Sequence, residues 1–470
     1  MNGISGYPTN PEGTKAMSFT SRNPANDQVI QSHTSWDDDL LNEALEKTHR
    51  AQQEWAQTTF SRRAGILRNV AARLRAQLAQ YAALITLEMG KPLREARAEV
   101  EKCAGACDFY AANAGEFLRD EPIASDAGKS YVAHYPLGVV LAVMPWNFPF
   151  WQVFRAAAPA LMAGNAVALK HAPNVPQCAL AIAAIFRDSG LPEGVFTNLM
   201  IEVEHVAGMI ASPHIHAVTL TGSEAAGRKV AACAGQHLKK CVLELGGSDP
   251  FIVLHDADLE PAVDTAVASR YLNGGQSCIA AKRFILVPQI AEEFLLRLKT
   301  KVEALKLGDP MDENTQIGPM ARADLRDNLH RQITESIAQG AIAVTGCKPV
   351  VREGFFYQPS ILDRVTSTAC AYHEELFGPV AIVIRAASEE DALRIANETR
   401  FGLGSSIWSR DVARAEQLAT HIQAGCSFIN GMVKSDPRLP FGGIKSSGYG
   451  RELSRLGIHE FVNPKTVWIR

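Results

Sequence analysis

Cys278 is the residue of this chain whose surroundings best fit a nucleophile. It ends the segment NGGQSC, residues 273–278. The nucleophilic form of cysteine is the thiolate, which is a minority species at neutral pH. The two glycines upstream allow a tight turn and leave space for a substrate beside the sulfur atom. The segment predicts covalent catalysis at Cys278. The alternative is a buried structural cysteine, which is what we expect of the remaining cysteines.

Glu244 is a carboxylate in the otherwise apolar stretch CVLEL, residues 241–245. In a strand, alternation places it on the same face as Val242. A buried carboxylate without a partner is costly, and burial raises its pKa, which suits a general base near neutral pH. The alternative is a buried glutamate bound to backbone amides.

Asn147 lies between two prolines in MPWNFPF, residues 144–150. A neutral amide held at the end of a strand can donate a hydrogen bond to a developing oxyanion. The alternative is an asparagine that satisfies only the turn in which it lies.

Two further positions could bind phosphate or ribose. The segment TGSEAAG, residues 221–227, is expected to follow a strand and to open a helix with Ser223 as N-cap. It lacks the GxGxxG spacing, so by itself it is a weak signal. Lys170 ends a predicted strand and could reach a ribose or phosphate; the alternative is a lysine that extends to the surface.

Two regions of alternating strands and helices position these residues. The apolar stretches of the first region are Val139–Val143, Ala166–Lys170, Ala217–Thr221 and Cys241–Leu245, and those of the second are Pro250–Leu254, Arg283–Val287 and Ala381–Arg385. Apolar strands that alternate with helices predict parallel sheets covered on both faces, whose ligand sites lie beyond the carboxyl ends of the strands. Asn147, Lys170, Ser223 and Glu244 all fall at such ends.

The N-terminal part of the chain has a helical pattern from residue 36 to 113. Ser35 is expected to cap the first helix, and residues 62–89 are expected to form a second one. Residues 1–16 are expected to be a loose tail without a targeting signal. No window is apolar enough to predict a membrane span.

Composition limits the classes of function. The 470 residues include 47 Lys and Arg against 50 Asp and Glu, a net charge of −3, which gives no electrostatic case for nucleic acid or an anionic membrane. Nine cysteines without a CxxC pair fit reduced thiols in a cytosol-like compartment. No Cys/His spacing matches a metal site, so we expect none.

In combination and in order, these segments resemble the aldehyde dehydrogenase superfamily from about Phe19 to Arg470. The matching pieces are PWNFP at 145–149, Lys170, TGSEAAG at 221–227, LELGG at 243–247, GQSC at 275–278, EELFGPV at 374–380, Asn430 and PFGGIKSSGYGRE at 440–452. The resemblance implies that Cys278 attacks an aldehyde and that Asn147 and the Cys278 N–H hold the oxyanion. It also implies that Glu244 activates the water that hydrolyses the thioester.

The resemblance implies an α/β fold with a Rossmann-like cofactor domain, a catalytic domain and a small β element for oligomerisation. The expected NAD(P)-binding domain is 1–114 and 134–245, the catalytic domain 246–445, and the bridging element 115–133 and 446–470. A homodimer or homotetramer in the cytoplasm follows by analogy.

The resemblance also implies a nicotinamide cofactor. The residues it assigns to the cofactor are Trp146, Lys170, Pro173, Gly222, Ser223, Leu245, Glu375 and Phe377. Lys170 corresponds to a ligand of the adenosine ribose, near which Trp146 is expected, Ser223 to a pyrophosphate contact, and Glu375 with Phe377 to the nicotinamide end. Pro173 stands where strict NAD users often carry a glutamate. We therefore expect NAD, with NADP possible.

Arg155 and Ser435 are the candidate substrate residues. Arg155 aligns with an arginine that binds the carboxylate of succinate semialdehyde in related enzymes; the alternative is a salt bridge to a protein carboxylate. Segments 169–176, 239–254 and 435–443 resemble a bacterial subgroup that oxidises this aldehyde to succinate in 4-aminobutyrate degradation. The alternatives are glutarate semialdehyde or an aromatic or aliphatic aldehyde, a cysteine hydrolase, and a catalytically silent binding protein.

Overall fold

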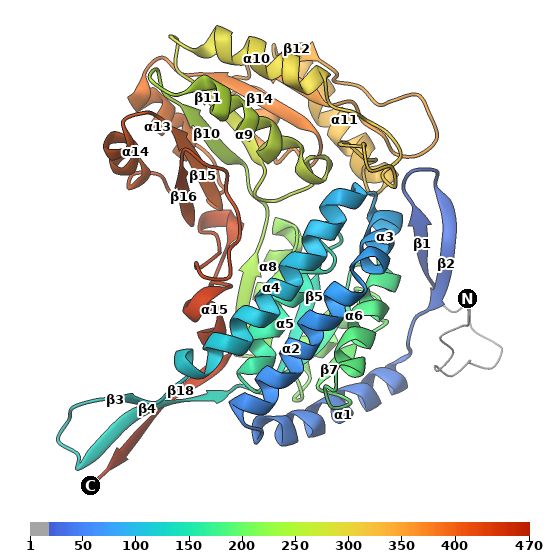
Figure 1. Ribbon diagram of the computed structural model, residues 1–470, viewed down its shortest axis with the longest axis vertical. Coiled ribbons are helices and arrows are strands. Elements are labelled where there is room, and N and C mark those ends of the chain that lie inside the picture. Colours follow the sequence, from blue (N-terminus) through green and yellow to red (C-terminus); the bar gives the residue numbers. More distant parts are fainter. Residues whose placement is uncertain (1–17) are drawn as a thin grey trace.

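Two large sheets, of six and seven strands, dominate the computed structural model (Figure 1). It describes residues 18–470, so the predicted loose tail at 1–16 lies outside the described residues. Two small antiparallel sheets of two and three strands accompany them. The predicted fold class, two parallel-sheet α/β units with a small separate β element, is confirmed.

The six-stranded sheet has the order β17-β9-β8-β5-β6-β7. Its strands are β5 (Val139–Met144), β6 (Ala166–His171), β7 (Phe196–Asn198), β8 (Ala217–Thr221), β9 (Lys240–Glu244) and β17 (Gly448–Tyr449). All neighbours are parallel except β17, which is antiparallel to β9. Thr221 pairs with Glu244, and Val143 pairs with Lys170. The carboxyl ends are therefore level, and the residues that follow them meet along one edge.

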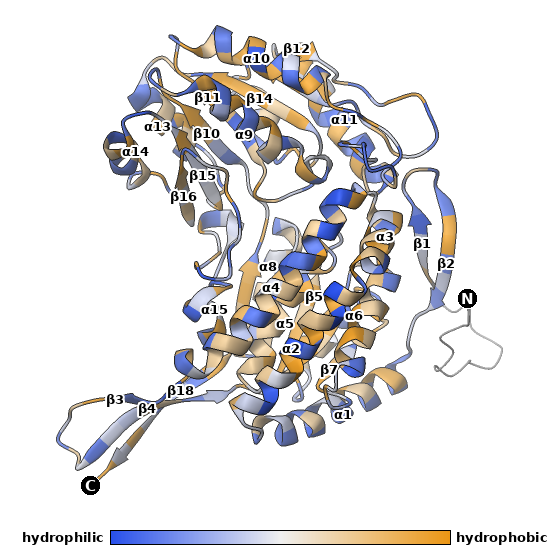
Figure 2. Cartoon of the chain, in the orientation of Figure 1, coloured by the Kyte–Doolittle hydropathy of each residue, from blue (hydrophilic) through white to orange (hydrophobic). Residues whose placement is uncertain are grey.

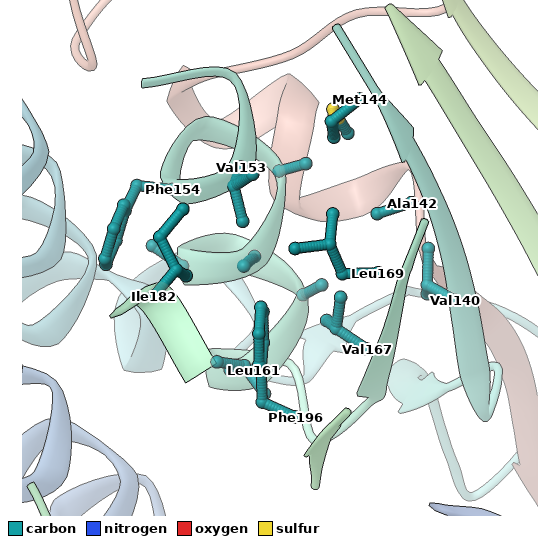
Figure 3. Close-up of a cluster of buried hydrophobic side chains, with 14 of the residues drawn as sticks. Val140, Ala142, Met144, Val153, Phe154, Leu161, Val167, Leu169, Ile182 and Phe196 are labelled. Carbon is teal, nitrogen blue, oxygen red and sulfur yellow. The ribbon is translucent and has the colours of Figure 1, made fainter. Parts of the chain in front are cut away.

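Helices cover this sheet on both faces. They are α1 (Asp38–Ala56), α2 (Phe60–Ala76), α3 (Leu78–Met89), α4 (Leu93–Phe117), α5 (Trp151–Met162), α6 (Pro176–Asp188), α7 (His205–Ala211) and α8 (Glu224–Gln236). Figure 3 shows Phe154 and Leu161 of α5 and Ile182 of α6 packed with Val167 and Leu169 of β6. Because the strands are buried on both faces, they read as continuous apolar runs.

Two expectations for the N-terminal helices were wrong in detail. The N-cap of α1 is Asp37, whose carboxylate accepts a hydrogen bond from the Leu40 N–H at 2.9 Å; Ser35 lies two residues too early. The single helix expected over 62–89 is two helices, α2 and α3, which are separated by the non-helical residue Gln77.

The seven-stranded sheet has the order β12-β13-β14-β11-β10-β15-β16. Its strands are β10 (Asp249–Val253), β11 (Ala281–Leu286), β12 (Ile342–Thr345), β13 (Ser360–Asp363), β14 (Val380–Arg385), β15 (Gly404–Trp408) and β16 (Cys426–Ile429). The accompanying helices are α9 (Leu259–Tyr271), α10 (Ala291–Glu303), α11 (Ala323–Ala338), α12 (Cys370–His373), α13 (Glu389–Asn397) and α14 (Val412–Ala419), with the short 3₁₀ helices η1 (Leu272–Gly275) and η2 (Lys445–Ser447). Only β12 is antiparallel to its neighbour.

A three-stranded arm projects away from both large sheets and carries the C-terminus (Figure 1). It consists of β3 (Glu121–Pro122), β4 (Lys129–Pro136) and β18 (Val462–Ile469). Of these strands, β18 follows α15 (Ser454–His459). A hairpin of β1 (Ser18–Asn23) and β2 (Gln28–Thr34) lies at the other end of the chain. The expected domain limits at 114 and 134 fall inside α4 and β4, and the division itself stays a prediction.

Hydrophobic residues concentrate on the central strands and the helix faces against them, whereas hydrophilic residues are frequent on the outer helices (Figure 2). Within residues 18–470, none of the helices combines the length and the apolar character needed to cross a bilayer.

Asn165 joins three segments at the start of β6. Its fully buried side chain accepts a hydrogen bond from the Gly138 N–H at 3.0 Å. It donates to the carbonyls of Ala160 at 3.2 Å and Phe461 at 2.9 Å. The last contact attaches the C-terminal segment to the six-stranded sheet.

We expect Asn165→Ala to lower the stability of the fold by about 2–4 kcal/mol, because it leaves buried backbone groups without partners. A thermal melt of the variant should show a lower Tm than that of the wild type. Asn328→Ala, at an exposed position of α11, is the control and should leave the Tm unchanged. Equal Tm values for both variants would contradict this role of Asn165.

Candidate active site

The turn that precedes Cys278 has an unusual backbone. Asn273, Gly274 and Gly275 have φ values of 56°, 59° and 73°, in the left-handed region. A Cβ atom at Gly275 would lie 2.2 Å from the carbonyl oxygen of Gly378, so this position needs glycine. Asn273 tolerates its conformation because its side chain and backbone are held by neighbours. Its N–H donates to a carboxylate oxygen of Glu95 at 2.7 Å.

Asn147 is tied to this turn by two hydrogen bonds. Its carbonyl accepts from Asn273 Nδ2 at 2.7 Å, and its own Nδ2 donates to the carbonyl of Gln276 at 3.1 Å. Asn147 follows β5 of one sheet, whereas the turn precedes β11 of the other. The amide has a second N–H, so one donor remains for a ligand. The structure thus brings together Asn147 and the turn that carries Cys278.

Cys278 is a partly buried thiol near several charges. Burial raises the pKa of Cys278 to about 12, although Arg155 and Lys282 act in the opposite direction. The thiol of the protein alone is therefore protonated at neutral pH. Lys282 is buried, and its Nζ donates to the carbonyls of Ser277 at 2.9 Å and Cys278 at 2.8 Å. It also forms an ion pair with Glu375 at 3.1 Å.

Glu244 ends β9 and is buried. Its two oxygens have no hydrogen-bond partner among the described residues. Gly442 packs closely against it, since a Cβ atom there would lie 2.7 Å from Glu244 Oε1. Burial, and then the nearby carboxylate of Glu452, raise the pKa of Glu244 to about 8. The carboxyl group is therefore mainly protonated at pH 7 and becomes a base as the pH rises through 8.

Arg155 forms a buried ion pair with Glu452. Its Nη2 donates to Thr221 Oγ1 at 3.2 Å, and its guanidinium lies 4.9 Å from the centre of the Phe441 ring. This pair corresponds to the alternative that the sequence left open for Arg155, and its substrate role stays a prediction. Glu452 could not be identified from the sequence as the partner of Arg155, because nothing in the segment PFGGIKSSGYGRE sets this glutamate apart.

Lys102 connects Ser435 to the start of α5, because it contacts both Ser435 and Trp151. Ser435 is buried, and its Oγ accepts a hydrogen bond from Lys102 Nζ at 2.7 Å. The start of α5 is held by Glu99, whose carboxylate accepts from the N–H groups of Phe150 at 2.9 Å and Trp151 at 3.0 Å. A carboxylate at a helix N-terminus is favourable for the helix dipole.

The predicted cofactor residues of the first region follow the carboxyl edge of the six-stranded sheet. Lys170 is buried at the end of β6, and its Nζ contacts only the His171 carbonyl, at 3.0 Å, among the described residues. Pro173 lines a small open pocket beside β6 and α6, together with His171 and Asn198. Ser223 caps α8 by accepting from the Ala226 N–H at 3.3 Å, and Gly222 precedes it. An exposed helix N-terminus fits a pyrophosphate.

The remaining cofactor residues lie where the two regions face each other. Leu245 packs against Gly227, where a Cβ atom would lie 2.5 Å from the leucine side chain. The rings of Trp146 and Phe377 meet edge to face at 5.8 Å. Trp146 was expected near the adenosine half, yet its contact here is with Phe377. Glu375 Oε1 accepts from the Gly247 N–H at 3.2 Å. The edge thus presents a buried lysine, a helix N-terminus and an aromatic pair, which are the kinds of group that hold a dinucleotide.

All nine cysteines carry free thiols. Over residues 18–470, no three or more His, Cys, Asp and Glu side chains gather in a group that could hold a metal ion.

Comparison with known proteins identifies the family. The aldehyde dehydrogenase family profile matches residues 11–467. A Mycobacterium tuberculosis protein named succinate-semialdehyde dehydrogenase (NADP+) 1 is 48% identical over 458 residues, with 96% of this chain and 100% of the relative covered. The Escherichia coli succinate semialdehyde dehydrogenase (NAD(P)+) Sad is 48% identical, with 97% and 98% covered. The chain therefore belongs to the aldehyde dehydrogenase family.

A solved structure agrees with this membership. The succinic semialdehyde dehydrogenase of Streptococcus pyogenes in complex with NADP+ superposes with a TM-score of 0.94 at 38% identity, covering 96% of this chain and 99% of that one.

The pKa of Glu244 tests whether the buried charges of Glu452 and Arg155 act on this carboxyl group. We expect Glu452→Gln to lower the pKa of Glu244, because it removes a nearby negative charge and leaves Arg155 to stabilise the Glu244 carboxylate. Infrared difference spectra against Glu244→Gln isolate the carboxyl band, which should disappear at a lower pH in Glu452→Gln than in the wild type. Glu303→Gln, exposed on α10, should leave the midpoint unchanged. A midpoint that stays the same or rises in Glu452→Gln would contradict the assignment.

Proposed function

We propose that the protein oxidises succinate semialdehyde to succinate with NAD(P)+, with Cys278 as nucleophile and Glu244 as base. The observation that carries the proposal is the pair of hydrogen bonds that hold Asn147 against the turn before Cys278, beside the buried Glu244. An amide donor, a thiol and a buried carboxyl group in one place are what acyl chemistry on an aldehyde requires. The names of the relatives support the choice of aldehyde.

In the first step, the Cys278 thiol releases its proton to water, and the resulting thiolate attacks the aldehyde carbon to form a thiohemiacetal anion. The negative charge that develops on the aldehyde oxygen is stabilised by the free N–H of Asn147 Nδ2 and by the Cys278 backbone N–H. The hydrogen bond from Asn147 Nδ2 to the Gln276 carbonyl fixes the side-chain amide, and the bond from Asn273 Nδ2 fixes the Asn147 backbone, so the donor does not need to reorganise as the charge appears. Lys282 holds the Cys278 backbone in place by donating a hydrogen bond to its carbonyl.

A bound NAD(P)+ would supply the hydride acceptor that is needed to convert the thiohemiacetal on Cys278 into a thioester. Lys170, Pro173, Gly222 and Ser223 would hold the adenosine and pyrophosphate part. Glu375 and Phe377 would hold the nicotinamide part, and Leu245 and Trp146 complete the proposed cofactor site, with Trp146 towards the adenosine half.

In the last step, Glu244 takes a proton from a water molecule, which attacks the thioester carbon. The carbon–sulfur bond breaks, the acid leaves, and Cys278 is restored. The pKa of about 8 places Glu244 where it can both accept and return a proton near neutral pH.

Both cofactors fit the proposal. Pro173 has no carboxylate that would repel a 2′-phosphate, and the relatives are named for NADP+ or NAD(P)+. The sequence left NADP+ possible beside NAD+, and we propose that the protein uses both.

The proposal also includes the oligomeric state, the cellular compartment and the pathway. The outer edge of β18 has no partner strand among the described residues, which supports pairing with a second copy in a homodimer or homotetramer. A cytoplasmic enzyme of 4-aminobutyrate degradation accords with the free thiols and the proposed substrate.

The substrate is tested against butanal, which has the same chain length without the carboxylate. We expect kcat/KM for succinate semialdehyde to exceed that for butanal by about 100-fold with either NAD+ or NADP+, as for two charge-assisted contacts. Cys278→Ser is the control and should abolish oxidation of both aldehydes. Equal kcat/KM values for the two aldehydes would contradict the proposed substrate.

The base is tested by the time course of Glu244→Gln. Because only the hydrolysis step needs this carboxylate, the variant should reduce one cofactor per active site rapidly and then turn over at least about 100-fold more slowly than the wild type. Stopped-flow absorbance of the reduced cofactor measures both phases. Glu335→Gln, exposed on α11, should turn over normally. Undiminished steady-state turnover of Glu244→Gln would contradict the role.

A further inference from the structure

Lys102 of α4 is a half-buried cation beside the predicted substrate residues. Its Nζ donates a hydrogen bond to Ser435 Oγ at 2.7 Å and lies 4.2 Å from the centre of the Trp151 ring. Trp151 is the first residue of α5, the helix that follows Asn147 and carries Arg155. Lys102 therefore connects the helix α4 to Ser435 and to the start of α5.

The charge of Lys102 has no counter-ion in the described chain. The two carboxylates that act on it are already paired with other cations: Glu99 with Lys91, and Asp436 with Arg438. Among residues 18–470, no carboxylate forms an ion pair with Lys102 itself. An ammonium group that is withdrawn from water without a counter-ion is costly. A bound anion would balance it.

The surroundings of Lys102 keep its ammonium group available. Burial, and then repulsion by Arg155, lower the pKa of Lys102 to about 8, which leaves most of it protonated at pH 7. The face of Trp151 stabilises the cation. Ser435 accepts the hydrogen bond from Lys102, so its own O–H remains free to donate to an anion.

Lys102 is connected to the nucleophile through Arg155. Trp151, which Lys102 contacts, and Arg155 are four residues apart on α5 and therefore share one face of that helix. The positive charge of Arg155 lowers the pKa of Lys102 and also acts to lower the pKa of Cys278. An aldehyde whose carbonyl lies at Cys278 could thus extend its far end towards Lys102. Because Glu452 already offsets the charge of Arg155, a second anion gains less from Arg155 than from Lys102.

We infer that Lys102 joins the predicted substrate residue Ser435 in binding the carboxylate of a short aliphatic aldehyde that is anionic at its far end, and that Lys102 sets the preference for such substrates. The inference rests on the proposed function, because it assigns the carboxylate of the proposed substrate to these two side chains.

The test measures the ratio of kcat/KM for succinate semialdehyde to kcat/KM for butanal with saturating NADP+. This ratio does not depend on the concentration of folded sites, so partial misfolding of a variant does not affect it. Lys102→Met has nearly the same length without the charge and should lower the ratio about 10- to 100-fold. Lys102→Arg should retain most of the ratio, and Ser435→Ala should lower it less than Lys102→Met does.

Lys47→Met is the matched control, because Lys47 is an exposed lysine of α1 that pairs with Glu193. It should leave the ratio unchanged. If Lys102→Met keeps the wild-type ratio while Arg155→Met loses it, the inference is overturned and the proposed function stands. If the wild type itself shows no preference for succinate semialdehyde, the proposed substrate is wrong and the inference fails with it.

Discussion

The hydrogen bonds between Asn147 and the turn at 273–276 are the constraint on which the site depends. They join the end of β5 in one sheet to the segment before β11 in the other. Without them, the amide donor and the thiol would belong to two separately positioned loops. The left-handed backbone of Asn273 is tolerated because its side chain makes this connection. The nucleophile and its oxyanion donor are therefore placed by one network.

The outer helix α4 supports this network from the side. Glu95, Glu99 and Lys102 have the spacing of one helix face, and each contacts a different part of the site. Glu95 accepts from the Asn273 N–H, Glu99 accepts from the first N–H groups of α5, and Lys102 donates to Ser435. A single rigid helix thus sets the nucleophile turn, the helix after Asn147 and the far wall of the site relative to one another.

Strand ends were predictable from the sequence because buried parallel strands give continuous apolar runs, as in Val139–Val143 and Ala217–Thr221. Cys278, Glu244 and Asn147 stood out because each is a reactive or polar group in a distinctive local pattern. Glu452, the partner of Arg155, and Lys102, the partner of Ser435, did not stand out, because contacts between residues hundreds of positions apart leave no local pattern in the sequence. The spacing of Glu95, Glu99 and Lys102, among the apolar residues of α4, was the pattern that could have suggested polar side chains aimed at a site.

The central claim of this account is that Cys278 forms a thioester with the substrate and that Glu244 is needed to hydrolyse it. The most direct measurement is peptide mass spectrometry of Glu244→Gln mixed with succinate semialdehyde and NADP+ and quenched after the first turnover. Nine cysteines compete for the label, so its position is informative. We predict a succinyl group on the peptide that contains Cys278 and on no other cysteine. An unmodified Cys278, or a label on a different cysteine, would contradict the account.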